Sequence, residues 1–170
     1  LDSHLCALMA AMHARALARI YVHFFADGRD VPPRSALTSL ERIERACASH
    51  GARISTVHGR FYAMDRDRRW ERVALAWDAL AHGQGVRVAS AREAIESAYA
   101  RGETDEFISP SVITADDRPV GTVQDGDAVI FCNFRADQFV LSLQSFNQRL
   151  EGAFVTDFTQ HFCRVCLNNI

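Results

Sequence analysis

Helix-like and strand-like apolar segments alternate along the first third of the chain. Residues 5–17 are rich in Ala, Leu and Met and predict a helix, whereas residues 20–25 form the continuous β-prone run of a buried strand. Ser35 can cap a second helix, whose apolar positions recur at helical spacing until Gly51, and residues 53–57 predict a second short strand. The order predicted here is helix, strand, helix, strand.

A third amphipathic helix is predicted after residue 67. Asp67 can cap it, Trp70 and Trp77 fall on the same apolar face as Val73, and Gly83 is placed to stop it. The simplest interpretation of this aromatic stripe is that both tryptophans belong to the core.

The rest of the chain, from residue 90 on, begins with a capping-box signal for a further helix. Ser90 and Glu93 have the spacing of a capping box, and the helix they begin is predicted to end at Gly102. Residues 103–126 are polar and turn-rich, with a strand-like piece over 107–113. The strongest buried-strand signal in the chain, residues 128–134, precedes a predicted helix over 137–150 and a last strand over 162–167.

This alternation predicts an α/β fold with helices layered around a mainly parallel central sheet. A chain of 170 residues with 48% hydrophobic content can bury one core, so we expect a single domain over 1–170.

A net charge of −2 provides no basic field for nucleic acid. The sequence has no apolar run long enough to span a membrane and no signal-peptide pattern. Its five cysteines are more consistent with reduced thiols than with disulfides, so we expect a cytoplasmic protein without a membrane partner.

All 19 basic residues are arginines, which excludes mechanisms that need a lysine. Three of the predicted strands are each followed directly by a segment that contains arginine. These are Arg29 after the first strand, Arg60 and Arg66 after the second, and Arg135 after the strand at 128–134. Loops at the carboxyl ends of parallel strands face one crevice, so these side chains are predicted to line a cleft for a small anion.

Asp30, beside Arg29, supplies an acceptor for hydroxyl groups and a possible proton carrier. A purely structural interpretation of the arginines also stays open: they would form ordinary salt bridges with neighbouring aspartates on solvated loops.

Other candidate chemistry is weaker. Cys163 and Cys166 with His161 supply only half of a zinc site, and no second ligand pair is visible. His23 and His58 are interpreted as core or loop histidines with satisfied hydrogen bonds. The chain contains no nucleophile signature such as Gly-x-Ser-x-Gly.

Four long motifs at these same loops resemble the cofactor-independent phosphoglycerate mutases. They read HFFADGRDVPPRSA (23–36), GRFYAMDRDRRWER (59–72), GETDEF (102–107) and GDAVIFCNFRAD (126–137). The resemblance covers roughly residues 3–137, whereas residues 151–170 diverge from the family pattern. It implies the transferase-type domain that is inserted in an alkaline-phosphatase-like enzyme.

The resemblance implies a function and a set of site residues. The family interconverts 3-phosphoglycerate and 2-phosphoglycerate, and its phosphatase-like half carries two manganese ions and a nucleophilic serine, neither of which is expected in this segment. Arg29 and Asp30 would contact the glycerate, with Asp30 also transferring protons, while Arg60, Arg66 and Arg135 would hold carboxylate or phosphate oxygens.

This chain departs from the family pattern in ways that limit what is carried over. Gln138 stands where the family has a second arginine, and His4 is assigned no role because the family's serine-histidine motif precedes the aligned region. We therefore expect a substrate-binding segment that is inactive without its phosphatase-like half. The alternative is a non-catalytic module that keeps the fold and uses it for anion binding or assembly.

Overall fold

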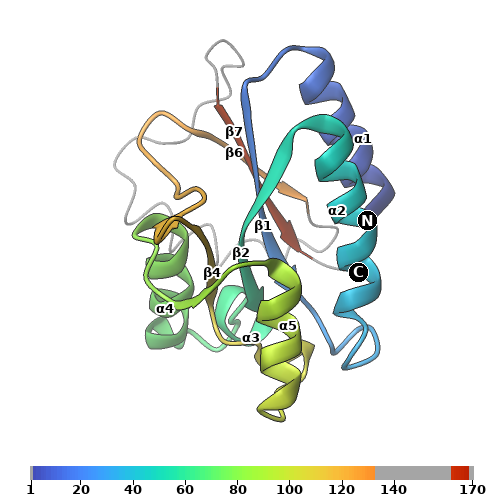
Figure 1. The fold of residues 1–170 in the computed structure, drawn as a ribbon. Coiled ribbons are helices and arrows are strands. Elements are labelled where there is room, and N and C mark those ends of the chain that lie inside the picture. Colours follow the sequence, from blue (N-terminus) through green and yellow to red (C-terminus); the bar gives the residue numbers. More distant parts are fainter. Residues whose placement is uncertain (1, 133–161, 169–170) are drawn as a thin grey trace.

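The computed structural model describes residues 2–132 and 162–168. Its elements follow the alternating order that the hydrophobic pattern predicts, with short additions (Figure 1). In chain order they are α1 (Asp2–Ala14), β1 (Arg19–Ala26), α2 (Ala36–His50), β2 (Ala52–Gly59), α3 (Arg60–Ala63), α4 (Trp70–Ala81), β3 (Val86–Val88), α5 (Ala91–Ala100), the 3₁₀ turn η1 (Asp105–Phe107), β4 (Ser111–Ala115), β5 (Arg118–Pro119), β6 (Ala128–Cys132) and β7 (Phe162–Asn168).

The strands form one sheet in the order β3-β4-β2-β1-β7-β6, and β5 pairs with β4 at its margin. Neighbouring strands run parallel except at the β2–β4 and β4–β5 pairs. The prediction of an α/β fold with a mainly parallel central sheet is therefore confirmed. The single antiparallel neighbour of β2 matters for the site, because it returns the chain from η1 alongside the carboxyl end of that strand.

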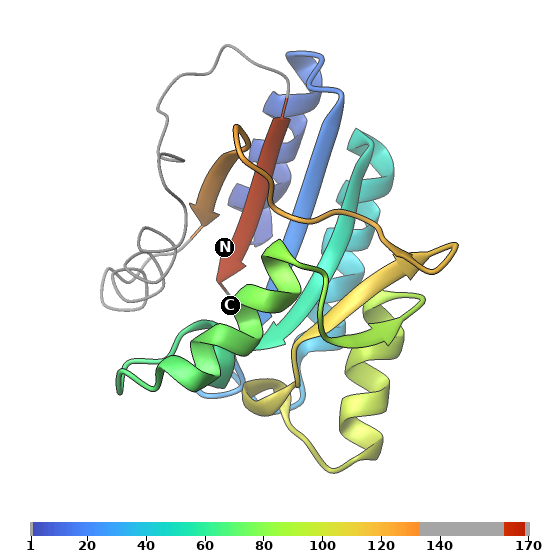
Figure 2. The same cartoon turned by 90° about the vertical axis from the view of Figure 1, so that its left-hand side faces the viewer.

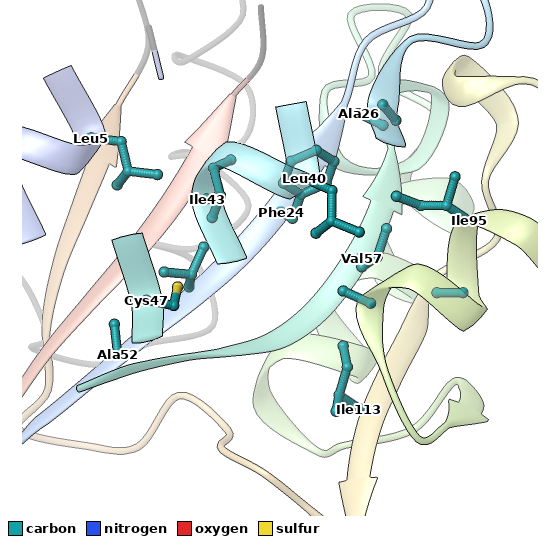
Figure 3. Packing of buried hydrophobic residues seen from close by; sticks show 14 of the residues in the cluster. Leu5, Phe24, Ala26, Leu40, Ile43, Cys47, Ala52, Val57, Ile95 and Ile113 are labelled. Carbon is teal, nitrogen blue, oxygen red and sulfur yellow. The ribbon is translucent and has the colours of Figure 1, made fainter. Parts of the chain in front are cut away.

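Helices cover both faces of the sheet. In the two views α1 and α2 lie against one face and α4 against the other (Figures 1 and 2). Leu40 and Ile43 of α2 meet Phe24 of β1 on the first face (Figure 3). Phe25, the next residue of β1, packs with Trp77 in a second cluster on the opposite face. Because β1 is buried on both sides, its sequence is continuously apolar rather than alternating.

Several local predictions needed correction. Helix α1 ends at Ala14, not residue 17, in a turn where Ala16 adopts a left-handed φ of 56°. Asp67 does not cap α4, which begins at Trp70 with Arg69 at the N-cap position. Trp77 belongs to the core as predicted, but Trp70 is 45% exposed, so its assignment to the core was wrong.

The strand-like piece at 107–113 resolves into η1 followed by β4, and the short edge strand β3 had no signal in the sequence. The strand predicted at 128–134 is present as Ala128–Cys132, but its residues are half-buried rather than buried as predicted. The last strand is present as Phe162–Asn168. The predicted helix at 137–150 lies outside the described residues.

Candidate active site

The first two arginine loops meet because β1 and β2 are parallel neighbours in register. Ala26, the last residue of β1, pairs with Gly59, the last residue of β2. Asp27 and Arg60 therefore leave the same edge of the sheet side by side. This confirms that the sequence segments after the first two strands share one space, as the parallel topology predicts.

Asp27 organises the first of these loops. Its carboxylate is buried, and Oδ1 accepts hydrogen bonds from the backbone N–H groups of Arg29 at 3.2 Å and Asp30 at 3.3 Å. An Asp side chain that bonds the backbone two and three residues later fixes a tight turn. The turn holds the backbone from which Arg29 and Asp30 project.

Arg60 lies between two carboxylates. Its Nη1 donates to Asp27 Oδ1 and lies 3.1 Å from Asp30 Oδ2, and the Arg60 side chain is only 4% exposed. Burial alone lowers the pKa of Arg60, but hydrogen bonds and the negative charges of Asp27 and Asp30 raise it overall. Arg60 and Asp27 therefore form a buried ion pair, not the solvated salt bridge that the alternative interpretation expected.

Asp30 and Arg29 form the open side of the same cluster. The Asp30 side chain is 47% exposed and Arg29 is 62% exposed, with Arg29 Nη1 at 3.8 Å from Glu106 Oε1. An exposed guanidinium beside an exposed carboxylate offers paired donors for an anion and an acceptor for a hydroxyl group. The geometry thus separates a fixed cation, Arg60, from an available one, Arg29.

The other predicted arginines are placed differently. Arg66 is exposed in the loop between α3 and α4. Arg135 lies outside the described residues, as does Gln138. The structure thus brings Arg29, Asp30 and Arg60 together, while the positions of Arg66 and Arg135 relative to this cluster stay predictions.

The loop that carries Arg66 is built around Asp65. Oδ2 of Asp65 accepts the backbone N–H groups of Asp67 at 3.1 Å and Arg69 at 2.7 Å, and Oδ1 lies 3.3 Å from Nη1 of Arg72. The Asp65 carboxylate is buried. The Arg72 guanidinium also stacks 3.9 Å above the ring of Phe61, directly after Arg60.

Residues 105–108 complete the site, and sequence reasoning assigned them no role. Besides the Glu106 contact with Arg29, the Phe107 ring lies 5.1 Å from that of Phe61, and the Gly59 N–H donates to the Ile108 carbonyl at 2.8 Å. The sequence signal for them was the family motif GETDEF (102–107), whose residues were given no role. Their partners are set by the antiparallel return of β4 along β2.

His23 and His58 lie in the core, one of the two positions predicted, but the expectation of satisfied hydrogen bonds is wrong for His58. His23 Nδ1 and His58 Nε2 lie 2.8 and 2.7 Å from the hydroxyl of Thr56, which bridges them. Burial lowers the pKa of His58 to about 3, so the ring is neutral at ordinary pH. Within the described part of the chain, Nδ1 of His58 has no hydrogen-bond partner.

Two further features concern only the residues that the structure describes. No group of three or more His, Cys, Asp or Glu side chains among them could hold a metal ion. No helix among them is long and apolar enough to cross a membrane.

Residues 1–168 match the sequence family described as BPG-independent PGAM N-terminus (iPGM_N). The chain belongs to this family. This confirms the resemblance inferred from the four motifs.

Two bacterial relatives carry the name 2,3-bisphosphoglycerate-independent phosphoglycerate mutase. The protein of Moorella thermoacetica is 50% identical over 152 residues, which cover 89% of this chain and 30% of that protein. The protein of Myxococcus xanthus is 55% identical over 137 residues, which cover 79% and 27%. This member of the iPGM_N family therefore spans about 30% of the length of the first of these relatives.

A solved structure shows the same fold. Crystal structures of Leishmania mexicana phosphoglycerate mutase, determined at low cobalt concentration, include a region that superposes with a TM-score of 0.82 at 29% sequence identity. The similarity covers 98% of this chain and 32% of that one. The iPGM_N segment thus keeps the backbone arrangement of the corresponding part of that phosphoglycerate mutase chain.

Proposed function

We propose that this chain is the substrate-binding transferase segment of a cofactor-independent phosphoglycerate mutase, which interconverts 3-phosphoglycerate and 2-phosphoglycerate in glycolysis and gluconeogenesis. The observation that carries the proposal is the cluster of Arg29, Asp30 and Arg60 at the carboxyl edge of β1 and β2. Family membership and the names of the relatives support the choice of substrate.

In this proposal the cluster divides the work of holding the glycerate. Arg29, exposed and only loosely paired with Glu106, would bind a carboxylate or phosphate oxygen of the ligand. Arg66 and Arg135 would contribute further charge. Asp30 would accept a hydrogen bond from a glycerate hydroxyl and exchange its proton, with the buried Arg60 fixing one of its oxygens at 3.1 Å.

Binding of the glycerate by several residues suits a reaction in which the phosphoryl group leaves the glycerate and returns at another hydroxyl. Between those steps the glycerate must stay bound and reorient, and several polar contacts from separate loops would prevent its loss to water. In the intact enzyme the nucleophilic serine would come from a phosphatase-like domain, which we propose as the partner of this segment. The isolated segment is expected to lack mutase activity.

Two manganese ions are proposed for that partner domain and none for the described residues, which offer no fitting ligand cluster. No step proposed for Arg29, Asp30 or Arg60 runs through a metal. We also propose a cytoplasmic location. The free thiols of Cys6, Cys47 and Cys132 support it, and burial raises the pKa of Cys47 to about 12, which keeps that thiol unreactive.

A second candidate function is supported by one residue. Gln138 replaces an arginine of the family pattern and cannot supply its charge. A non-catalytic module that binds another anion, or takes part in assembly, would tolerate this replacement. Such a module would bind 3-phosphoglycerate no better than inorganic phosphate.

Calorimetric titration with 3-phosphoglycerate tests the proposal. We expect weak binding that declines with added salt and is abolished in both Arg29→Ala and Arg66→Ala. Arg53→Ala is the matched control, because Arg53 is an exposed arginine at the amino end of β2, away from the cluster. Binding that survives unchanged in Arg29→Ala and Arg66→Ala would show that the arginines do not hold the ligand.

A further inference from the structure

The buried carboxylate of Asp105 lies where three distant parts of the chain meet. Asp105 begins η1, between α5 and β4, and its side chain is fully buried. One oxygen, Oδ2, accepts hydrogen bonds from the backbone N–H groups of Ser35 at 2.7 Å and Ala36 at 3.0 Å. The other oxygen, Oδ1, accepts a hydrogen bond from the hydroxyl of Tyr99 in α5.

These contacts give α2 an N-terminal cap from outside the helix. Ser35 occupies the N-cap position, but its side chain makes no cap hydrogen bond and its hydroxyl donates instead to the Pro32 carbonyl at 2.8 Å. The first N–H groups of a helix need an acceptor, and a negative charge there is favoured by the helix dipole. The sequence prediction that Ser35 itself caps α2 is thus replaced by a carboxylate 70 residues away.

Asp105 also fixes the preceding loop. Its own N–H donates to the Pro33 carbonyl at 2.8 Å. At the other end of that loop Gly28, with a φ of +67°, approaches so closely that an added Cβ would lie 2.8 Å from Asp105 Cβ and 2.7 Å from the Glu106 nitrogen. The segment from Gly28 to Ala36, which carries Arg29 and Asp30, is thus held at both ends by Asp105 and its neighbour.

We propose that Asp105 is a positioning residue for the anion site: it sets where Arg29 and Asp30 stand without touching the ligand itself. The identity of the ligand rests on the proposed function, but the fixing of the loop does not. Burial raises the pKa of Asp105, while the hydrogen bonds from Tyr99, Ser35 and Ala36 act in the opposite direction. Replacing the carboxylate by an amide removes the charge and weakens acceptance from N–H groups on two separate segments.

The test compares Asp105→Asn with Asp127→Asn in the full chain. Asp127 is also buried and also accepts a backbone N–H, from Gln124 at 2.8 Å, but it precedes β6 at the amino end of the sheet. Asp105→Asn should weaken 3-phosphoglycerate binding about tenfold, while Asp127→Asn binds like the parent. In hydrogen exchange, only Asp105→Asn should speed exchange of the amides of residues 28–36.

The outcomes separate the two claims. If the parent chain does not bind 3-phosphoglycerate, the proposed function fails, and faster exchange over 28–36 in Asp105→Asn alone still supports the positioning role. A folded Asp105→Asn variant that binds and exchanges like the parent overturns it. Should Asp105→Asn not fold, Tyr99→Phe removes one donor to the carboxylate: faster exchange over 28–36 supports the role, and parental exchange overturns it.

Discussion

Neutralising Asp27 probes the buried ion pair on which the site depends. Asp27→Asn keeps the size of the side chain and an oxygen that can still accept the N–H groups of Arg29 and Asp30. It removes the charge that compensates Arg60, which is only 4% exposed. A guanidinium buried without its counter-charge is unfavourable, because it has lost its hydration and gains no equivalent attraction in return.

The size of the effect follows from what remains. Removing one partner of a buried pair typically costs about 3–5 kcal/mol of unfolding free energy. Asp30 stays at 3.1 Å from Arg60 Nη1, but it is 47% exposed and its attraction is screened by solvent. We therefore expect Asp27→Asn to lose about 3 kcal/mol, at the lower end of that range.

Urea unfolding of four chains measures this: the parent, Asp27→Asn, Arg60→Met and the double variant. Removing both charges leaves neither Arg60 nor Asp27 as a buried ion without its partner, so the double variant should be more stable than the sum of the single losses by at least about 2 kcal/mol. Asp125→Asn, at an exposed position, is the control and should change stability by less than about 0.5 kcal/mol. An equally small change in Asp27→Asn would refute the reasoning.

Three further predictions address packing, acid stability and charge. Gly51 and Gly28 share a φ near +66°, but an added Cβ meets nothing within 4 Å at Gly51, whereas at Gly28 it meets a backbone atom at 2.7 Å. Gly28→Ala should therefore lose about 1–3 kcal/mol more unfolding free energy than Gly51→Ala in urea. Equal losses would contradict the close approach at Gly28. Burial lowers the pKa of His58 from 6.5 to about 3, so the unfolded chain takes up the proton first; stability is full above pH 6.5 and falls towards pH 3, by about 2 kcal/mol between pH 7 and 5. His58→Gln should flatten that pH dependence, and an unchanged slope would count against the assignment. Gln138→Arg should tighten 3-phosphoglycerate binding in calorimetry, and no gain would argue that residue 138 does not face the ligand.

The elements that the sequence predicted are those whose signal is local. Strand β1 is buried on both faces and so appears as an uninterrupted apolar run. Helix α5 is capped by Ser90, whose hydroxyl accepts the Glu93 N–H at 3.1 Å, while the Glu93 carboxylate accepts the Ala89 N–H at 2.8 Å. The partners of the α5 cap lie within a few residues, and the apolar run of β1 is visible without knowing which distant residues cover it.

Features that depend on distant partners escaped the sequence. The capping of α2 by Asp105 joins residues 70 positions apart, so Ser35 looked sufficient by itself. The burial of Arg60 depends on the parallel register of β1 and β2, which places Asp27 beside it. Asp67 was the predicted cap of α4, but the path of the loop makes Asp65 the acceptor of the Arg69 N–H. The motifs located the site, and the sheet topology supplied its internal connections.

Hydrogen exchange with and without 3-phosphoglycerate tests the central claim most directly, because it maps where the ligand sits. The account predicts slower exchange of amides in residues 28–30 and 59–66 at saturating ligand. It predicts no change around the cavity of about 270 Å³ at the opposite end of β2, which is lined by Arg53, Ile113 and Thr114 among others. Protection confined to that cavity, or unchanged exchange over 28–30 and 59–66, would contradict an anion site at the carboxyl edge of β1 and β2.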